Sequence, residues 1–76
     1  MIDRKIFSER LITLRKEHGL TIVDIANALS IVKQSVHTWE NMKTLPTLDK
    51  AAALADLLGV SLDYLVGRTD NPEVNR

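Results

Sequence analysis

The residues that could do chemistry in this chain gather in one short segment, KQSVHTWEN at positions 33–41. Val36 and Trp39 are spaced to face inward from one helix, so the polar side chains share the opposite face. These outward residues are Lys33, Gln34, His37, Thr38 and Asn41. Glutamine pairs with adenine through two hydrogen bonds, and lysine donates to the acceptors of guanine. The segment therefore presents side chains that suit base edges, although any solvated helix face can hold such residues.

No catalytic or metal-binding pattern is visible in the sequence. His18 and His37 are the only histidines, they lie on different predicted elements, and the chain has no cysteine. Neither histidine has a carboxylate at the spacing that metal ligands need. The serines have no base placed to activate them, and the three glycines all follow predicted helices. We therefore expect no metal, no cofactor and no enzymatic activity.

Five predicted helices and no strand position the polar segment. They cover residues 6–18, 22–29, 33–41, 48–58 and 62–66. Phe7, Leu11 and Leu14 recur at the spacing of an apolar helix stripe. Thr21 and Asp24 have the spacing of a capping box at the start of the second helix.

Apolar spacing also predicts which faces of these helices are buried. Between Leu29 and Val32 there is room only for a turn, so the second and third helices form a helix-turn-helix. The apolar positions of this pair are Leu20, Ile25, Ala26, Leu29, Ile31, Val36 and Trp39. In the fourth helix we expect the inward residues to be Leu48, Ala51, Ala52, Ala55 and Leu58.

Length and composition indicate one small globular domain. The chain has 76 residues, with ten basic residues balanced by ten acidic ones. Residues 1–67 form the predicted compact bundle, and residues 68–76 form a polar tail that we expect to be mobile. The sequence has no apolar run long enough for a membrane span and no signal-peptide pattern, so we expect a cytoplasmic protein.

Four segments in order resemble the phage-repressor and Cro-like helix-turn-helix family, also called Xre-like. They are FSERLITLRKEHGLT, DIANAL, SVHTWEN and LPTLDKAAALADLLGVSLDYLVG. The resemblance implies a lambda-repressor-like, compact five-helix bundle that binds double-stranded DNA. It implies a transcriptional regulator, with a repressor as the expected type, that binds its operator as a homodimer. Larger family members carry a sensor domain, and we expect no small-molecule ligand domain here.

The resemblance also assigns roles to individual residues. Lys33, Gln34, His37 and Thr38 fall where relatives touch base edges. Ser35, Asn41 and Lys43 fall where relatives touch phosphates. Arg15 and Glu40 match a structural ion pair that fixes the recognition helix against the first helix.

Three positions depart from the family pattern. Ile22 stands where glutamine is common, Val32 where serine or threonine caps the recognition helix, and Ser30 where glycine is common. Val32 could contact a thymine methyl group, or these apolar residues could be isolated surface positions. A further alternative is a protein-interaction module, an antirepressor or a partner subunit, that uses a patch of Ile22, Val23 and Val32.

Overall fold

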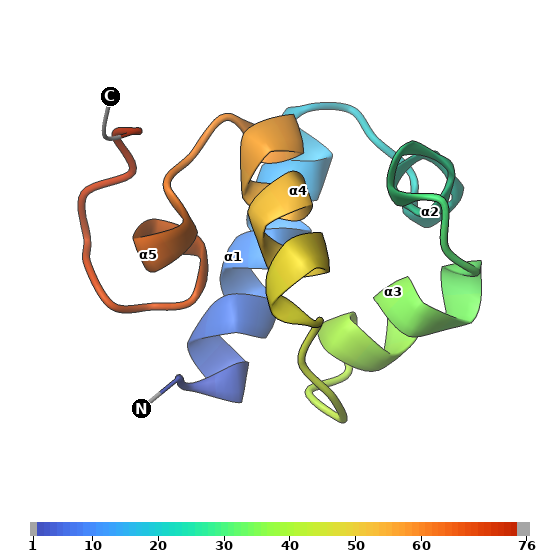
Figure 1. The fold of residues 1–76 in the computed structure, drawn as a ribbon, viewed down its shortest axis with the longest axis horizontal. Helices are drawn as coiled ribbons and strands as arrows, with labels where there is room; N and C mark the ends of the chain where they lie inside the picture. The colour runs from blue at the N-terminus through green and yellow to red at the C-terminus, as the bar shows by residue number, and fades with distance from the viewer. Residues whose placement is uncertain (1, 75–76) are drawn as a thin grey trace.

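A computed structural model describes residues 2–74 and shows an all-α fold in that part of the chain (Figure 1). The helices are α1 Arg4–Glu17, α2 Ile22–Leu29, α3 Lys33–Glu40, α4 Leu48–Leu58 and α5 Leu62–Leu65. The predicted five-helix architecture is confirmed. α1 begins earlier than the apolar stripe indicates because Asp3 caps it, its carboxylate accepting the Lys5 N–H at 2.8 Å.

The main packing contacts between the helices form a closed ring. α1 packs against α3 and α5, α2 packs against α3 and α4, and α4 packs against α5. In Figure 1, α5 lies to the left of α1 and α4, and α2 and α3 lie to the right. None of these helices is long and apolar enough to cross a membrane, as judged over residues 2–74.

One apolar core fills this ring, and it corrects part of the prediction for α4. Phe7, Leu11 and Val36 are fully buried, as the sequence predicts for their helices. In α4, Leu54 is fully buried, whereas Leu48 is 76% exposed and Ala52 faces solvent. Leu48 keeps the helical spacing of the buried stripe, but it lies in the first turn of α4, where no neighbouring helix covers it.

The turn between α2 and α3 uses a left-handed residue. Ser30 has φ 56° and ψ 45°. The next residue, Ile31, donates its N–H to the Ala26 carbonyl at 2.9 Å, which satisfies a carbonyl at the end of α2. From α4, the Lys50 ammonium donates to the Leu29 carbonyl at 2.9 Å. The Lys50 cation also interacts favourably with the negative, C-terminal end of the α2 dipole. Through this contact α4 fixes the turn.

α3 begins without a side-chain cap, and this omission gives a stability prediction. Val32 has the extended backbone of an N-cap residue, but no side-chain hydrogen bond caps the helix, and Val32 is 67% exposed. Val32→Ser should raise the free energy of unfolding by about 1 kcal/mol. Thermal denaturation should then show a melting temperature higher by about 4–8 °C. Val32→Ala is the control, and a serine variant no more stable than the alanine variant would refute the prediction.

The segment after α5 folds back onto the body of the protein. The Arg10 guanidinium donates from Nη1 to the Thr69 carbonyl at 2.8 Å and from Nη2 to Asp70 at 3.1 Å. Ser61 donates its N–H to the Pro72 carbonyl at 3.0 Å. These contacts hold residues 69–72 beside α5. Mobility of the tail stays a prediction, and its last two residues lie outside the described part of the chain.

Candidate nucleic-acid interface

α3 separates a buried face from a polar face along its whole length. Val36 is fully buried and Trp39 is 5% exposed, so both anchor the helix in the core. Lys33, Gln34 and His37 are exposed. The anchoring residues and the exposed ones alternate at helical spacing, so the core fixes the direction in which the exposed side chains project. The structure therefore brings these three predicted base-contacting residues to one accessible surface.

Thr38, also predicted to contact a base, has a hydroxyl that is engaged within the protein. It is half-buried, and its Oγ1 donates to the Ser35 carbonyl at 2.8 Å. The same Oγ1 lies 2.9 Å from the Thr44 hydroxyl oxygen. Ser35, a predicted phosphate contact, is half-buried as well. The side chain of Thr38 thus ties α3 to the loop that follows it.

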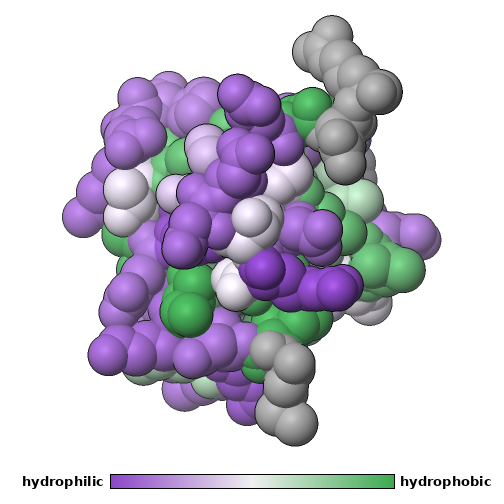
Figure 2. Space-filling view, turned by 90° about the vertical axis from the view of Figure 1, so that its left-hand side faces the viewer, coloured by the Kyte–Doolittle hydropathy of each residue, from purple (hydrophilic) through white to green (hydrophobic). Residues whose placement is uncertain are grey.

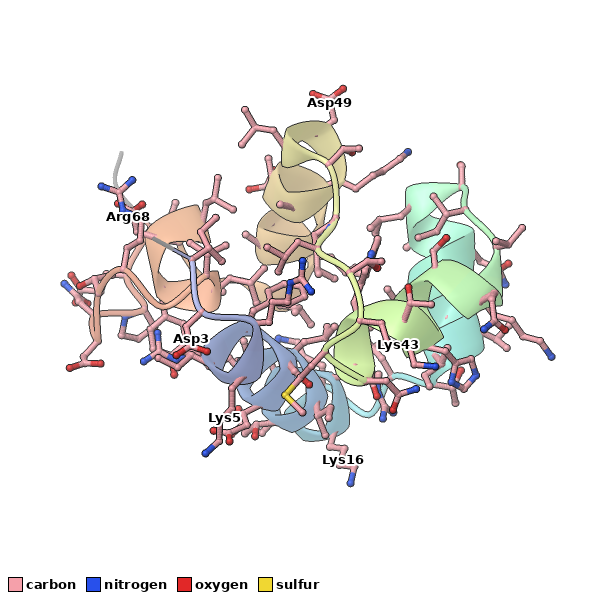
Figure 3. The ribbon with its side chains drawn as sticks, turned by 90° about the horizontal axis from the view of Figure 1, so that it is seen from below. Asp3, Lys5, Lys16, Lys43, Asp49 and Arg68 are labelled. Atoms are coloured by element: carbon pink, nitrogen blue, oxygen red, sulfur yellow. The ribbon has the colours of Figure 1, made fainter. Side chains whose placement is uncertain are left out.

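That loop presents two of the predicted phosphate contacts, Asn41 and Lys43, both of which are exposed. Its backbone is fixed at several points. The Lys43 N–H donates to the Thr38 carbonyl at 3.0 Å, and the Lys43 carbonyl accepts from Arg4 Nη1 at 3.2 Å. Figure 3 shows Lys43 beside the end of α3. The lysine therefore projects from a positioned backbone.

α1 holds the C-terminal end of α3 through three side-chain contacts. Arg15 meets both carboxylate oxygens of Glu40, with Nε–Oε2 at 2.8 Å and Nη2–Oε1 at 3.3 Å. The two side chains are only 15% and 10% exposed. Ser8, which is 4% exposed, donates its hydroxyl to the Glu40 carbonyl at 2.6 Å. Arg15 neutralises the Glu40 carboxylate, so α3 carries no unpaired acid beside its polar face.

Comparison with known families decides what this arrangement is. Residues 11–65 match the family model described as helix-turn-helix. This match includes α2, the turn and α3, together with the second half of α1 and all of α4 and α5. The chain belongs to the Cro-like (Xre-like) helix-turn-helix family. The Arg15–Glu40 ion pair lies at the two positions where the resemblance to this family implies one.

Several members of this helix-turn-helix family are similar over most of the chain. The uncharacterized HTH-type transcriptional regulator YobD of Bacillus subtilis (strain 168) is 41% identical over 68 residues, covering 90% of this chain and 61% of that protein. The 26 kDa repressor protein of Escherichia phage HK022 is 32% identical over 73 residues, covering 91% of this chain and 31% of that protein.

A solved structure agrees with this family assignment. The crystal structure of a transcriptional regulator from Listeria innocua superposes with a TM-score of 0.75 at 34% identity, covering 92% of this chain and 61% of that one. The chain therefore spans less than two thirds of the length of each of these three relatives.

The departures from the helix-turn-helix family pattern have different structural settings. Ile22 is half-buried and packs against the core, which accounts for an apolar residue at the start of α2. Val23 and Val32 are 49% and 67% exposed. In the patch of the alternative hypothesis, only Val23 and Val32 are thus freely accessible, and Ile22 is half-buried.

Three contacts of this helix-turn-helix were missed by the sequence analysis. They are made by Ser8 to α3, by Lys50 to the end of α2 and by Arg4 to the loop after α3. Ser8 carries a usable signal, because it follows Phe7 on the inward half of α1, where an unpaired hydroxyl would be costly. Lys50 and Arg4 have no such signal, since their acceptors are backbone carbonyls of other elements.

Proposed function

We propose that this chain is a sequence-specific DNA-binding transcriptional regulator of the Cro/C1 type, acting as a repressor, that reads the major groove with α3. The observation that carries the proposal is the exposed set of Lys33, Gln34 and His37 on a helix anchored by Val36 and Trp39. The names of the relatives support it, since one is a phage repressor and another an HTH-type transcriptional regulator. In a helix-turn-helix of this kind the second helix enters the groove.

The proposed roles follow the chemistry of each side chain. Lys33, Gln34 and His37 read base edges, and the methyl group of Thr38 adds apolar contact because its hydroxyl is engaged elsewhere. Ser35, Asn41 and Lys43 hold phosphates. Phosphate contacts fix the register of the protein and base contacts supply sequence preference.

Two copies complete the proposed complex. One module of this size buries too little DNA surface for high specificity, so a homodimer on two half-sites about one helical turn apart is expected. The net charge is zero, so binding depends on where charges lie rather than on their sum. The operator is double-stranded DNA, and a cytoplasmic location follows from that partner.

Gln34→Ala should weaken binding to the selected operator by about tenfold and relax preference at one base pair, because a bidentate contact to adenine is lost. The site is first obtained by selection from a random duplex library, and affinity is then measured by fluorescence anisotropy at several salt concentrations. Lys33→Ala should weaken binding similarly. Lys5→Ala is the matched control, since Figure 3 shows Lys5 on α1, away from α3.

Two results would refute the proposed function. One is a selection that enriches no motif. The other is a Lys33→Ala, Gln34→Ala double variant that binds DNA as the unaltered protein does. Binding to a protein that is lost in a Val23→Ser, Val32→Ser variant, with no DNA motif enriched, would favour the protein-interaction alternative instead.

A further inference from the structure

Arg4, the first residue of α1, lies against the loop that follows α3. Its guanidinium donates from Nη1 to the Lys43 carbonyl at 3.2 Å. A guanidinium carries five N–H donors, and the Arg4 side chain makes no other hydrogen bond within residues 2–74. The residue is also exposed. Arg4 therefore presents several donors to solvent from a fixed position beside Lys43, a predicted phosphate contact.

Three positive side chains around α3 have no acidic partner in the part of the chain that the structure describes. No ion pair there includes Arg4, Lys33 or Lys43. The one acid of α3, Glu40, is paired with Arg15 at 2.8 Å. The three cations therefore remain available to an anion that approaches α3.

Asp3, the acid next to Arg4, is engaged at the start of α1. Its carboxylate accepts the N–H groups of Lys5 and Ile6 at 2.8 and 3.4 Å. The positive end of the α1 dipole further compensates the charge of this carboxylate. Figure 3 shows Asp3 and Lys5 together at the start of α1, with Lys43 apart from both and beside α3. Asp3 therefore does not occupy the position between Arg4 and Lys43.

Hydrophilic surface alone does not single out this position. The side of the molecule that carries α5, opposite α3, is also largely hydrophilic (Figure 2). The arginines there are paired with acids, Arg10 with Asp70 at 3.1 Å and Arg68 with Asp63 at 3.7 Å. An anchored guanidinium next to cations without acidic partners is found beside α3 instead.

We propose that the DNA-binding surface extends beyond the helix-turn-helix to α1, where Arg4 and Lys43 hold the same phosphate group of the DNA backbone. A phosphate at this position lies within reach of both side chains, because the Arg4 guanidinium rests on the Lys43 backbone. The arginine can bind two phosphate oxygens through its fork of donors, and the lysine adds a point charge on a flexible stem. The inference rests on the proposed function, since the phosphate belongs to the duplex that α3 reads.

Arg4→Gln removes the charge and keeps a donor for the Lys43 carbonyl, so the loop retains its support. Affinity for a random-sequence duplex and for the selected operator should fall equally, by about fivefold. The plot of log affinity against log salt concentration should become less steep by about 0.9, the change for one lost phosphate contact. Fluorescence anisotropy measures both quantities. Lys5→Gln is the matched control, an exposed neighbour on α1 that should leave the slope unchanged.

The salt slope separates this contact from the proposed function. An enriched DNA motif together with an unchanged slope for Arg4→Gln would overturn the phosphate contact alone. A slope that changes as expected, in a protein that enriches no motif, would refute the sequence-specific function and leave the contact supported. A protein that binds no duplex DNA would overturn both.

A scan of the selected operator with uncharged methylphosphonates, one backbone position at a time, tests whether the phosphate is shared. One replacement should weaken binding of the unaltered protein by about tenfold, and binding of Arg4→Gln and of Lys43→Gln by about threefold each. The double variant should bind the replaced and the normal duplex equally. Two separate phosphates, one coupled to each residue, would overturn the shared site.

Discussion

Glu40→Ala should lower the free energy of unfolding by about 3 kcal/mol, because it leaves the Arg15 guanidinium buried without its counter-charge. Arg15 is only 15% exposed and meets both oxygens of the carboxylate. In the variant its remaining protein acceptor is the Leu20 carbonyl, 3.1 Å from Nη1. The melting temperature of so small a domain should fall by more than about 10 °C, as measured by circular dichroism.

Two further variants separate this effect from the loss of any glutamate. Glu9 Oε1 lies 4.0 Å from Lys5 Nζ, and both side chains are well exposed. Glu9→Ala should therefore lower the free energy of unfolding by less than about 0.5 kcal/mol. Replacing both partners, Arg15→Met with Glu40→Leu, should recover most of the stability, because no charge is left unpaired. Equal losses for Glu40→Ala and Glu9→Ala would show that the ion pair contributes nothing.

Arg10→Ala should lower the free energy of unfolding by about 2–3 kcal/mol, because it removes charged hydrogen bonds and an aromatic contact together. Arg10 Nη1 donates to the carbonyls of Tyr64 and Thr69, and its guanidinium lies 4.0 Å from the centre of the Tyr64 ring. The side chain is 20% exposed, so water replaces these contacts poorly. Urea denaturation measures the loss. Amide hydrogen exchange should also show faster exchange at Arg68, Asn71 and Glu73.

The matched control for Arg10 is Arg68. Its ion pair with Asp63 spans 3.7 Å between side chains that are 69% and 62% exposed, so Arg68→Ala should change stability by less than about 0.5 kcal/mol. Arg10→Lys should recover part of the loss, because the ammonium keeps the charge but not the fork of donors. A loss for Arg10→Ala no larger than for Arg68→Ala would contradict the role assigned to Arg10.

Local rules were sufficient for the helices and for most of their ends, although the sequence analysis did not predict the Asp3 cap that starts α1 at Arg4. Thr21 and Asp24 form the capping box that their spacing predicts. Phe7, Leu11 and Leu14 are buried as their periodicity indicates. These features depend on residues within a few positions of one another, so the sequence contains the information directly.

Features that depend on distant partners could not be read in the same way. Periodicity placed Leu48 in the core, although only the arrangement of neighbouring helices decides whether the first turn of α4 is covered. Ser8 and Arg10 donate to carbonyls 32 and 54 positions away. The inward position of Ser8 signals that its hydroxyl needs a partner, but a carbonyl leaves no trace in residue type, so neither partner could be identified. The engagement of the Thr38 hydroxyl was not foreseen either, although its partners, the Ser35 carbonyl and the Thr44 hydroxyl, are near in sequence. The base and phosphate contacts themselves stay predictions.

The ring of helices has a consequence for how the molecule comes apart. Around the ring the order is α1, α3, α2, α4, α5, so the first and last helices of the chain meet and close it. A linear stack can shed its end member and keep every other contact. In a ring, any helix that leaves uncovers apolar surface on two neighbours. We therefore expect folding to be all-or-none, with no stable subset of helices and with the geometry of α3 dependent on a contact between the two ends of the bundle.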